Sequence, residues 1–296
     1  MGLREGHILY GCALVAFGLW HLFNNIKLFC LRPNTFNSSP WFPTSKTRYL
    51  ELYLIMSYSS VFMSVELFFG LIKHQPRNFE HSSIGMSLLA YAVLALVLDR
   101  AKPRAAASEG LTLLALAAAF TQELLLFHFH SADHMGVEGQ YHLAFQLIIF
   151  VSLLTTLMGI ALPKSFLVSL VRSSSIAFQG AWLILIGFML YTPSLIPKGC
   201  YFQDIEIFFF FCLTWGVAKS LANLEFSWLF VINTIFVVTL YLILDRVYGG
   251  NVQCSSLTTS YQSEQYDEER QHFEPHSTQK MCSVQMGKLV DHGDKM

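Results

Sequence analysis

Four histidines and two acids gather in one short segment, residues 127–142. The histidines are His128, His130, His134 and His142, and the acids are Asp133 and Glu138. Imidazole nitrogens and carboxylate oxygens held in fixed positions are ligands for zinc and other borderline transition metals. The segment therefore predicts a site that binds a metal ion or exchanges protons.

The spacing of these residues predicts which of them lie together. Residues four or seven apart share a helix face, so Glu123, His130 and His134 face together if their helix continues into the segment. Glu138 and His142 form a second pair, four residues apart, where the next helix begins. Two helix ends would then present carboxylates and imidazoles to one place.

The composition places these helices in a membrane. Of the 296 residues, 53% are hydrophobic and 13% charged, against roughly 25% charged in a soluble domain. This composition excludes a soluble globular enzyme and a disordered protein. The net charge of -1 and the lack of a basic stripe exclude a nucleic-acid binder. The predicted fold class is all-α, a polytopic membrane helix bundle whose partner is membrane lipid.

Crossing the hydrocarbon core takes about 20 helical residues. Six apolar runs are clearly long enough, and one further apolar region is ambiguous. That region, 205–244, is too long for one span. It predicts either an interfacial or re-entrant piece at 205–218 before a seventh span, or eight spans, and we expect seven. The spans lie near 8–29, 49–72, 82–98, 108–127, 142–162, 173–192 and 222–244. Residues 1–248 form the transmembrane domain, and the polar segment 249–296 is expected to be a disordered tail.

Lysine and arginine predict the orientation of these spans. Ten fall on one side and four on the other, which favours an N-terminus outside or in the lumen and a cytosolic tail. Seven of the eight histidines before the tail then lie at the exoplasmic ends of the spans, and His21 lies elsewhere. Ionisable groups at membrane depth usually mark a site, so His7, His81 and Glu66 are additional candidate ligands.

Structural explanations compete with each functional one. The histidines could join helix ends in a polar network or form a pH-responsive surface, and neither H-E-x-x-H nor a His-His pair is present. Glu51 is expected to be a snorkelling or paired carboxylate, and Arg172 to lie at the headgroups where the sixth span begins. Gly180, in the run 179–182, predicts close helix packing, with a cofactor contact as the alternative.

The sequence resembles the transmembrane protein 45 family, membrane proteins of plants and animals with a domain of unknown function. The resemblance covers about 1–245 and depends on Gly6-His7, Glu51, Glu80-His81-Ser-Ser, Glu123 with the histidine-rich turn, and Gln179-Gly-Ala-Trp182. The long turn is similar to the plant branch, whose members are linked loosely to virus response. The resemblance implies seven helices, residence in endomembranes or the plasma membrane, and no established activity. It also implies Glu123, His130, Glu138 and His142 as the first candidates, with His128 and His134 second.

Three functions remain open at this stage. One is a metal-dependent lipid hydrolase in which zinc lowers the pKa of a bound water and a glutamate acts as base. The second is a transporter or sensor of metal ions or protons. The third is a non-catalytic membrane scaffold. A pocket open to lipid beside a metal position would favour the first, a polar path past His21 the second, and neither feature the third.

Overall fold

The computed structural model describes residues 3–74, 76–101, 105–133, 137–192, 200–205, 207–212 and 215–249, without the side chains of 130–133, 200–212 and a few helix ends. The chain divides into two units, Met1–Tyr241 and Leu242–Met296, and every contact discussed below lies within the first. The predicted tail falls almost wholly outside the described residues, so its disorder stays a prediction.

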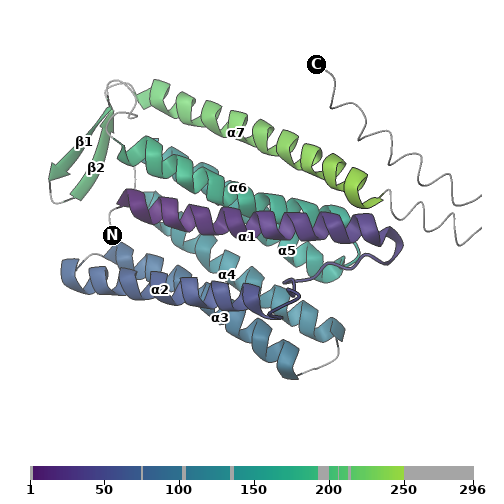
Figure 1. Cartoon of the computed structure of the whole chain (residues 1–296). Helices are drawn as coiled ribbons and strands as arrows, with labels where there is room; N and C mark the ends of the chain where they lie inside the picture. The colour runs from purple at the N-terminus through teal and green to yellow at the C-terminus, as the bar shows by residue number, and fades with distance from the viewer. Residues whose placement is uncertain are drawn as a thin grey trace, which may run out of the picture. The chain divides into compact units, whose positions relative to one another are not determined.

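Within the described residues, seven helices are long and apolar enough to cross a membrane, which confirms the predicted seven-span bundle. The odd-numbered helices begin on the side where the chain starts, here called the N-terminal side (Figure 1). The helices are α1 Leu3–Leu31, α2 Leu50–Lys73, α3 Pro76–Ala101, α4 Ala105–Asp133, α5 Val137–Ala161, α6 Phe166–Tyr191 and α7 Trp215–Leu244.

The region before α7 differs from the prediction. Instead of an interfacial or re-entrant piece at 205–218, two strands form an antiparallel hairpin in which Cys200 pairs with Cys212. The strands are β1 Cys200–Ile205 and β2 Ile207–Cys212. Phenylalanine and isoleucine dominate β2, and such residues favour strands as well as membrane helices. The hairpin removes the excess length that made 205–244 ambiguous.

Helices α1 and α6 approach closely through glycine. A Cβ added to Gly18 would lie 2.3 Å from the backbone nitrogen of Ala177, and one added to Gly180 would lie 2.4 Å from the carbonyl oxygen of Gly11. Only residues without side chains allow backbones to meet at this separation. The expected close packing around Gly180 is confirmed.

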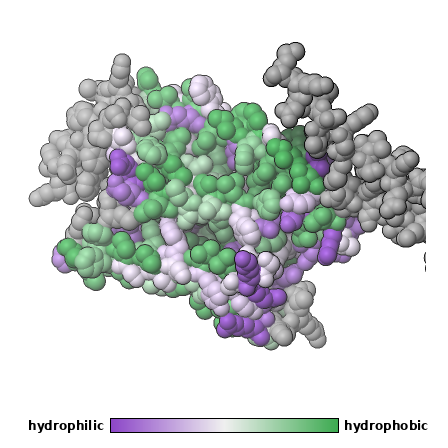
Figure 2. Space-filling model, viewed as in Figure 1, coloured by the Kyte–Doolittle hydropathy of each residue, from purple (hydrophilic) through white to green (hydrophobic). Residues whose placement is uncertain are grey.

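Helices α2 to α6 pack mainly as neighbours in sequence, α2 with α3, α3 with α4, α4 with α5 and α5 with α6. Hydrophobic residues cover most of the face formed by α7, α1 and α2, and hydrophilic residues gather near the helix ends (Figure 2). Large apolar side chains are exposed along these helices, among them Leu54, Val61, Trp228 and Ile235. A surface of this extent is suited to lipid, so the chain is an integral membrane protein.

The α1–α6 contact predicts a sharp effect of one methyl group. Gly180→Ala places a carbon 2.4 Å from the oxygen of Gly11, and overpacking of this kind costs about 1–3 kcal/mol of unfolding free energy. Thermal unfolding of the detergent-purified protein measures the loss. Gly216→Ala is the matched control, because nothing lies within 4 Å of its added Cβ. Equal melting temperatures for the two variants would contradict the close packing.

Candidate functional site

Three of the four leading site residues are buried toward the N-terminal side of the bundle. Glu123 of α4 accepts a hydrogen bond from the hydroxyl of Tyr10 on α1 at 3.3 Å. Glu138 and His142 lie one turn apart at the start of α5. The ring of His142 stacks on Phe127 of α4, with centroids 5.8 Å apart. Because α4 continues to residue 133, its end meets the start of α5.

A chain of polar side chains crosses the N-terminal side and joins five helices. Glu66 of α2 lies 3.8 Å from Nδ1 of His81 on α3. The ring of His7 on α1 has its centroid 6.5 Å from that of His81 and 5.2 Å from that of Tyr191 on α6. The Tyr191 hydroxyl donates to Glu138 of α5 at 3.2 Å. We call these five residues the N-terminal network, because they extend across the helices on the N-terminal side.

Among the remaining predicted ligands, only His128 has a described side chain, and it contacts a different residue. His128 is exposed near the end of α4, and its Nδ1 lies 3.2 Å from Oε1 of Gln146. The side chain of His130 and the whole of His134 lie outside the described residues. Within the described part of the chain, no three His, Cys, Asp or Glu side chains could hold a metal ion together. The metal site therefore stays a prediction.

The buried carboxylate of Glu51 joins α1, α2 and the loop between them. Nε2 of His21 lies 2.8 Å from one carboxylate oxygen. Nε1 of Trp20 and the backbone N–H of Phe42 each donate to the other oxygen at 2.8 Å. We call these four groups the Glu51 junction. Of the two expectations for this acid, pairing is confirmed and snorkelling is excluded.

The α1–α2 loop folds back into the bundle beside this junction. The backbone N–H of Ser38 donates to the carbonyl of Pro163, and its hydroxyl accepts from Nη2 of Arg172, both at 2.8 Å. The hydroxyl of Tyr91 on α3 donates to the carbonyl of Pro40 at 2.9 Å. Residues 38–42 therefore close the bundle on the side opposite the N-terminus.

The far end of the same loop is held by a charged contact. Arg48 lies over the rings of Trp41 and Tyr49 and donates to Asp99 of α3 at 3.1 Å. Hydrogen bonding to the Asp99 carboxylate, and its charge, raise the pKa of Arg48. The guanidinium thus stays charged and anchors the loop to α3.

Arg172 corrects the prediction of an arginine at the headgroups. Its side chain is 1% exposed, because α6 begins at Phe166 and draws Arg172 into the bundle. Gly159 of α5 makes the room, since a Cβ there would lie 2.7 Å from Nη1 of Arg172. The guanidinium is therefore used to hold Ser38 of the loop.

A cavity of about 470 Å³ lies between α1 and α2, with parts of α3, α4 and α6 behind it. Its walls are mostly apolar, and Glu51 and Trp20 lie at the end near the loop. The lining residues Ala16 and Leu54 are exposed. Because both belong to membrane-spanning helices, the cavity opens toward lipid. We call it the interhelical cavity.

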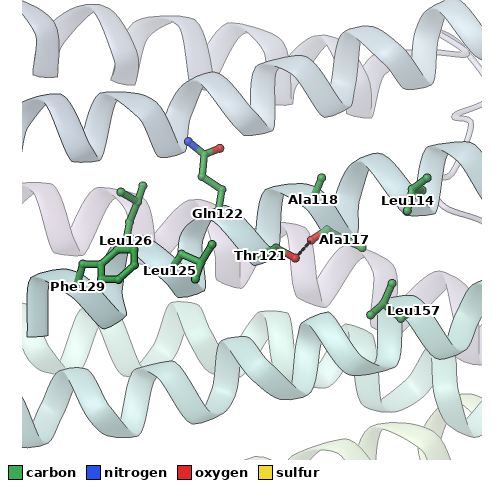
Figure 3. A pocket seen from close by; sticks show the side chains of 9 residues that line it. All are labelled: Leu114, Ala117, Ala118, Thr121, Gln122, Leu125, Leu126, Phe129 and Leu157. Carbon is green, nitrogen blue, oxygen red and sulfur yellow. Dashed lines mark hydrogen bonds between the residues drawn. The ribbon is translucent and has the colours of Figure 1, made fainter.

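A second hollow lies between α4 and α5. Figure 3 shows side chains of α4 along it, with Leu157 from α5 at its edge. Thr121 donates to the carbonyl of Ala117 at 2.8 Å, and Gln122 donates to the carbonyl of Ser83 on α3 at 3.1 Å. Its polar side chains are thus already bonded to backbone, and the hollow is an open apolar groove.

Sequence reasoning missed the cavity and most of its polar lining. Glu51 and His21 were noticed singly, but their pairing joins residues 30 positions apart. Tyr58, Ser59 and Tyr91 carried no signal, because hydroxyl residues scattered through apolar helices are common. A search for hydroxyls on the helix faces that also carry ionisable residues could have found them.

Comparison with known families identifies similarity over the second half of the bundle. A family model described as a family of unknown function, DUF716, matches residues 109–242. The match includes α5, α6 and nearly all of α4, with Glu123, Glu138 and His142, and most of α7. The α1 and α2 walls of the interhelical cavity precede it. The narrower resemblance to the transmembrane protein 45 family stays a prediction.

Loss of the Glu51 carboxylate should destabilise the fold strongly. Glu51→Ala leaves the ring N–H groups of Trp20 and His21 and the backbone N–H of Phe42 without their shared acceptor, and each buried polar group left unbonded costs about 1–3 kcal/mol. Chemical unfolding in detergent measures the change. Glu5→Ala is the control, because that carboxylate is half exposed beside Arg4 and such pairs contribute about 1 kcal/mol at most. If Glu51→Ala were as stable as Glu5→Ala, the junction would not hold the helices together.

Proposed function

We propose that this integral membrane protein binds a lipid in the interhelical cavity. The observation that carries the proposal is a cavity of about 470 Å³ that opens between two membrane-spanning helices. Small-molecule sites typically occupy about 300–1,000 Å³ and have mostly apolar walls. A molecule that enters this opening comes from the bilayer, and the bilayer is made of lipid.

The lining favours an amphiphile, a molecule with an apolar body and a polar group. Phe17, Leu88 and Leu116 offer apolar walls from three helices, and Glu51 offers a polar end. In such sites the apolar walls contact most of the ligand surface and supply most of the binding energy, while a few polar groups fix the orientation of the ligand. A hydrophobic body with one polar group fits both parts of the lining.

We assign binding and not hydrolysis to this cavity. Nucleophilic hydrolysis needs an activated nucleophile, most often a hydroxyl or thiol within hydrogen-bond reach of a base. Nε2 of His21 is instead 2.8 Å from the carboxylate of Glu51. That carboxylate also receives bonds from Trp20 and from the backbone of Phe42. Groups committed in this way position the helices and are not available as a base.

We further propose that the chain keeps the orientation favoured by its lysines and arginines, with the N-terminus outside or in the lumen and the tail in the cytosol. The Glu51 junction then lies in the cytosolic half of the membrane, and the N-terminal network lies in the exoplasmic half. Lipid would enter the cavity from the side, between α1 and α2.

Filling the cavity should prevent lipid binding. Ala13, a half-buried residue of α1, lines the cavity, and Ala13→Trp would place an indole inside it. With the protein in nanodiscs, a photoreactive lipid should label peptides of α1 and α2, and the variant should label at least about tenfold less, a loss of 1.4 kcal/mol or more. Mass spectrometry of the labelled peptides gives the measurement.

The groove on α4 supplies a matched control. Ala118 is exposed and lines that groove, so Ala118→Trp adds the same side chain without entering the interhelical cavity. Labelling of α1 and α2 should remain at the wild-type level. Labelling unchanged by Ala13→Trp, or spread equally over α4, would overturn the proposed site.

A second candidate function is binding of a divalent metal such as zinc at the N-terminal side. It is favoured by Glu138 and His142, two potential ligands buried one turn apart at the start of α5. His130 belongs to the end of α4, so its backbone lies on the helix that meets α5. Glu123, His128, His134 and His81 remain possible further ligands of this proposed site.

Metal content tests this second candidate directly. Inductively coupled plasma mass spectrometry on the purified protein should find near-stoichiometric zinc or iron, and a folded His130→Ala/His142→Ala variant should lose it. Gln140→Ala is a suitable control, because the Gln140 amide donates to Asn223 of α7 at 2.6 Å and amides are poor zinc ligands. Wild-type protein without metal would exclude the candidate.

A further inference from the structure

Two hydroxyl groups in the wall of the interhelical cavity have unused hydrogen-bonding capacity. They are the hydroxyls of Tyr58 and Ser59, neighbouring residues of α2 that both line the cavity. Both oxygen atoms are buried, and neither has a hydrogen-bond partner among the described residues. Buried hydroxyls are almost always bonded, because leaving them unbonded is costly. An occupant of the cavity can supply the missing partner.

Serine hydroxyls elsewhere in α2 and α3 are bonded in the usual way. Ser64 donates to the carbonyl of Ser60, and Ser87 donates to the carbonyl of Ile84, each at 2.8 Å. Bonding to a carbonyl one turn back is the common state of serine in a membrane helix. Ser59 could reach the preceding turn in the same way and does not. Its hydroxyl is thus oriented for a different acceptor or donor.

The depth of these hydroxyls restricts the chemistry of the partner. Tyr58 lies eight residues after Leu50, the first residue of α2, which is about 12 Å along the helix axis. That position lies well inside the hydrocarbon core, which is about 30 Å thick. A charged headgroup at this depth is expensive, whereas a single neutral oxygen bonded to two hydroxyls is not.

The charges around the cavity point in the same direction. The described lining residues include no lysine or arginine, and Glu51 is the one acid among them. That carboxylate is already paired with His21. The buried cation Arg172 donates to Ser38 and does not line the cavity. An anionic headgroup would therefore meet a carboxylate and no compensating cation.

From these observations we infer that the lipid bound in the cavity is neutral and carries a hydroxyl or carbonyl oxygen that bonds to Tyr58 and Ser59. This inference rests on the proposed lipid-binding function and names its ligand class. Two kinds of membrane lipid share the required chemistry. Sterols carry a hydroxyl on a rigid apolar body, and diacylglycerols carry a hydroxyl and ester carbonyls on flexible chains.

Photoreactive probes separate these lipid classes. Nanodiscs holding the full chain are titrated with a photoreactive sterol, diacylglycerol or phosphatidylserine, or with an oxygen-free hydrocarbon carrying the same reactive group. We expect saturable labelling of α1 and α2 by at least one neutral lipid, and much weaker labelling by phosphatidylserine. Labelling by the sterol alone, or by diacylglycerol alone, supports the inference and identifies the source of the oxygen.

The variant Tyr58→Phe/Ser59→Ala removes both hydroxyls and keeps the apolar wall. It should bind the neutral lipid about five- to tenfold more weakly, as expected for loss of one or two hydrogen bonds. Labelling by the hydrocarbon probe should be unchanged, which shows that the cavity is intact. Tyr53→Phe/Ser64→Ala is the matched control, because Tyr53 is exposed, Ser64 bonds to Ser60 and neither residue lines the cavity.

The outcomes distinguish failure of the inference from failure of the proposed function. Equal labelling by phosphatidylserine and the neutral lipids, or undiminished neutral-lipid affinity in Tyr58→Phe/Ser59→Ala, would overturn the inference while leaving a lipid site. Absence of saturable labelling by every probe, the hydrocarbon included, would overturn the lipid site itself.

Discussion

The placement of one carboxylate inside a membrane constrains much of this bundle. A buried Glu51 is tolerable only if donors surround it, and those donors come from separate parts of the chain. Trp20 and His21 belong to α1, and the third donor is the backbone of Phe42 in the loop. The hydrogen bonds of this one carboxylate therefore fix α1, α2 and the loop relative to one another at one end of the bundle.

A second constraint acts on α1, where this helix packs against α6. Gly11 and Gly18 of α1 meet the backbone of α6 closely enough that a single added carbon would collide. Helix α1 is thus committed along its length to α6, while its tie to α2 is concentrated near Glu51. Because α1 packs closely on α6 and is tied to α2 mainly at Glu51, space remains between α1 and α2. The interhelical cavity occupies this space.

The sequence predicted what depends on local pattern. Apolar length predicted the seven spans. The shared face of Glu123 and the histidines was predicted only on the condition that α4 continues beyond residue 127, and α4 does continue to Asp133. Packing between residues far apart in the sequence could not be predicted from local pattern. Arg172 was misplaced because its burial needs the space left by Gly159 on another helix. The hairpin at 200–212 was missed because short apolar runs do not separate strands from helices. His21 and Glu51 stood out individually, but only a folded loop shows why they need each other.

The loop at 38–42 also determines which concentration of a ligand would set the occupancy of the cavity, that in water or that in the membrane. With one end of the bundle covered by buried backbone and aromatic side chains, exchange with the cavity proceeds sideways, within the plane of the bilayer. Occupancy is then governed by the mole fraction of the ligand among its neighbouring lipids and not by an aqueous concentration. The same chain with the same affinity would be empty in one membrane and filled in another, so that membrane composition itself sets its state.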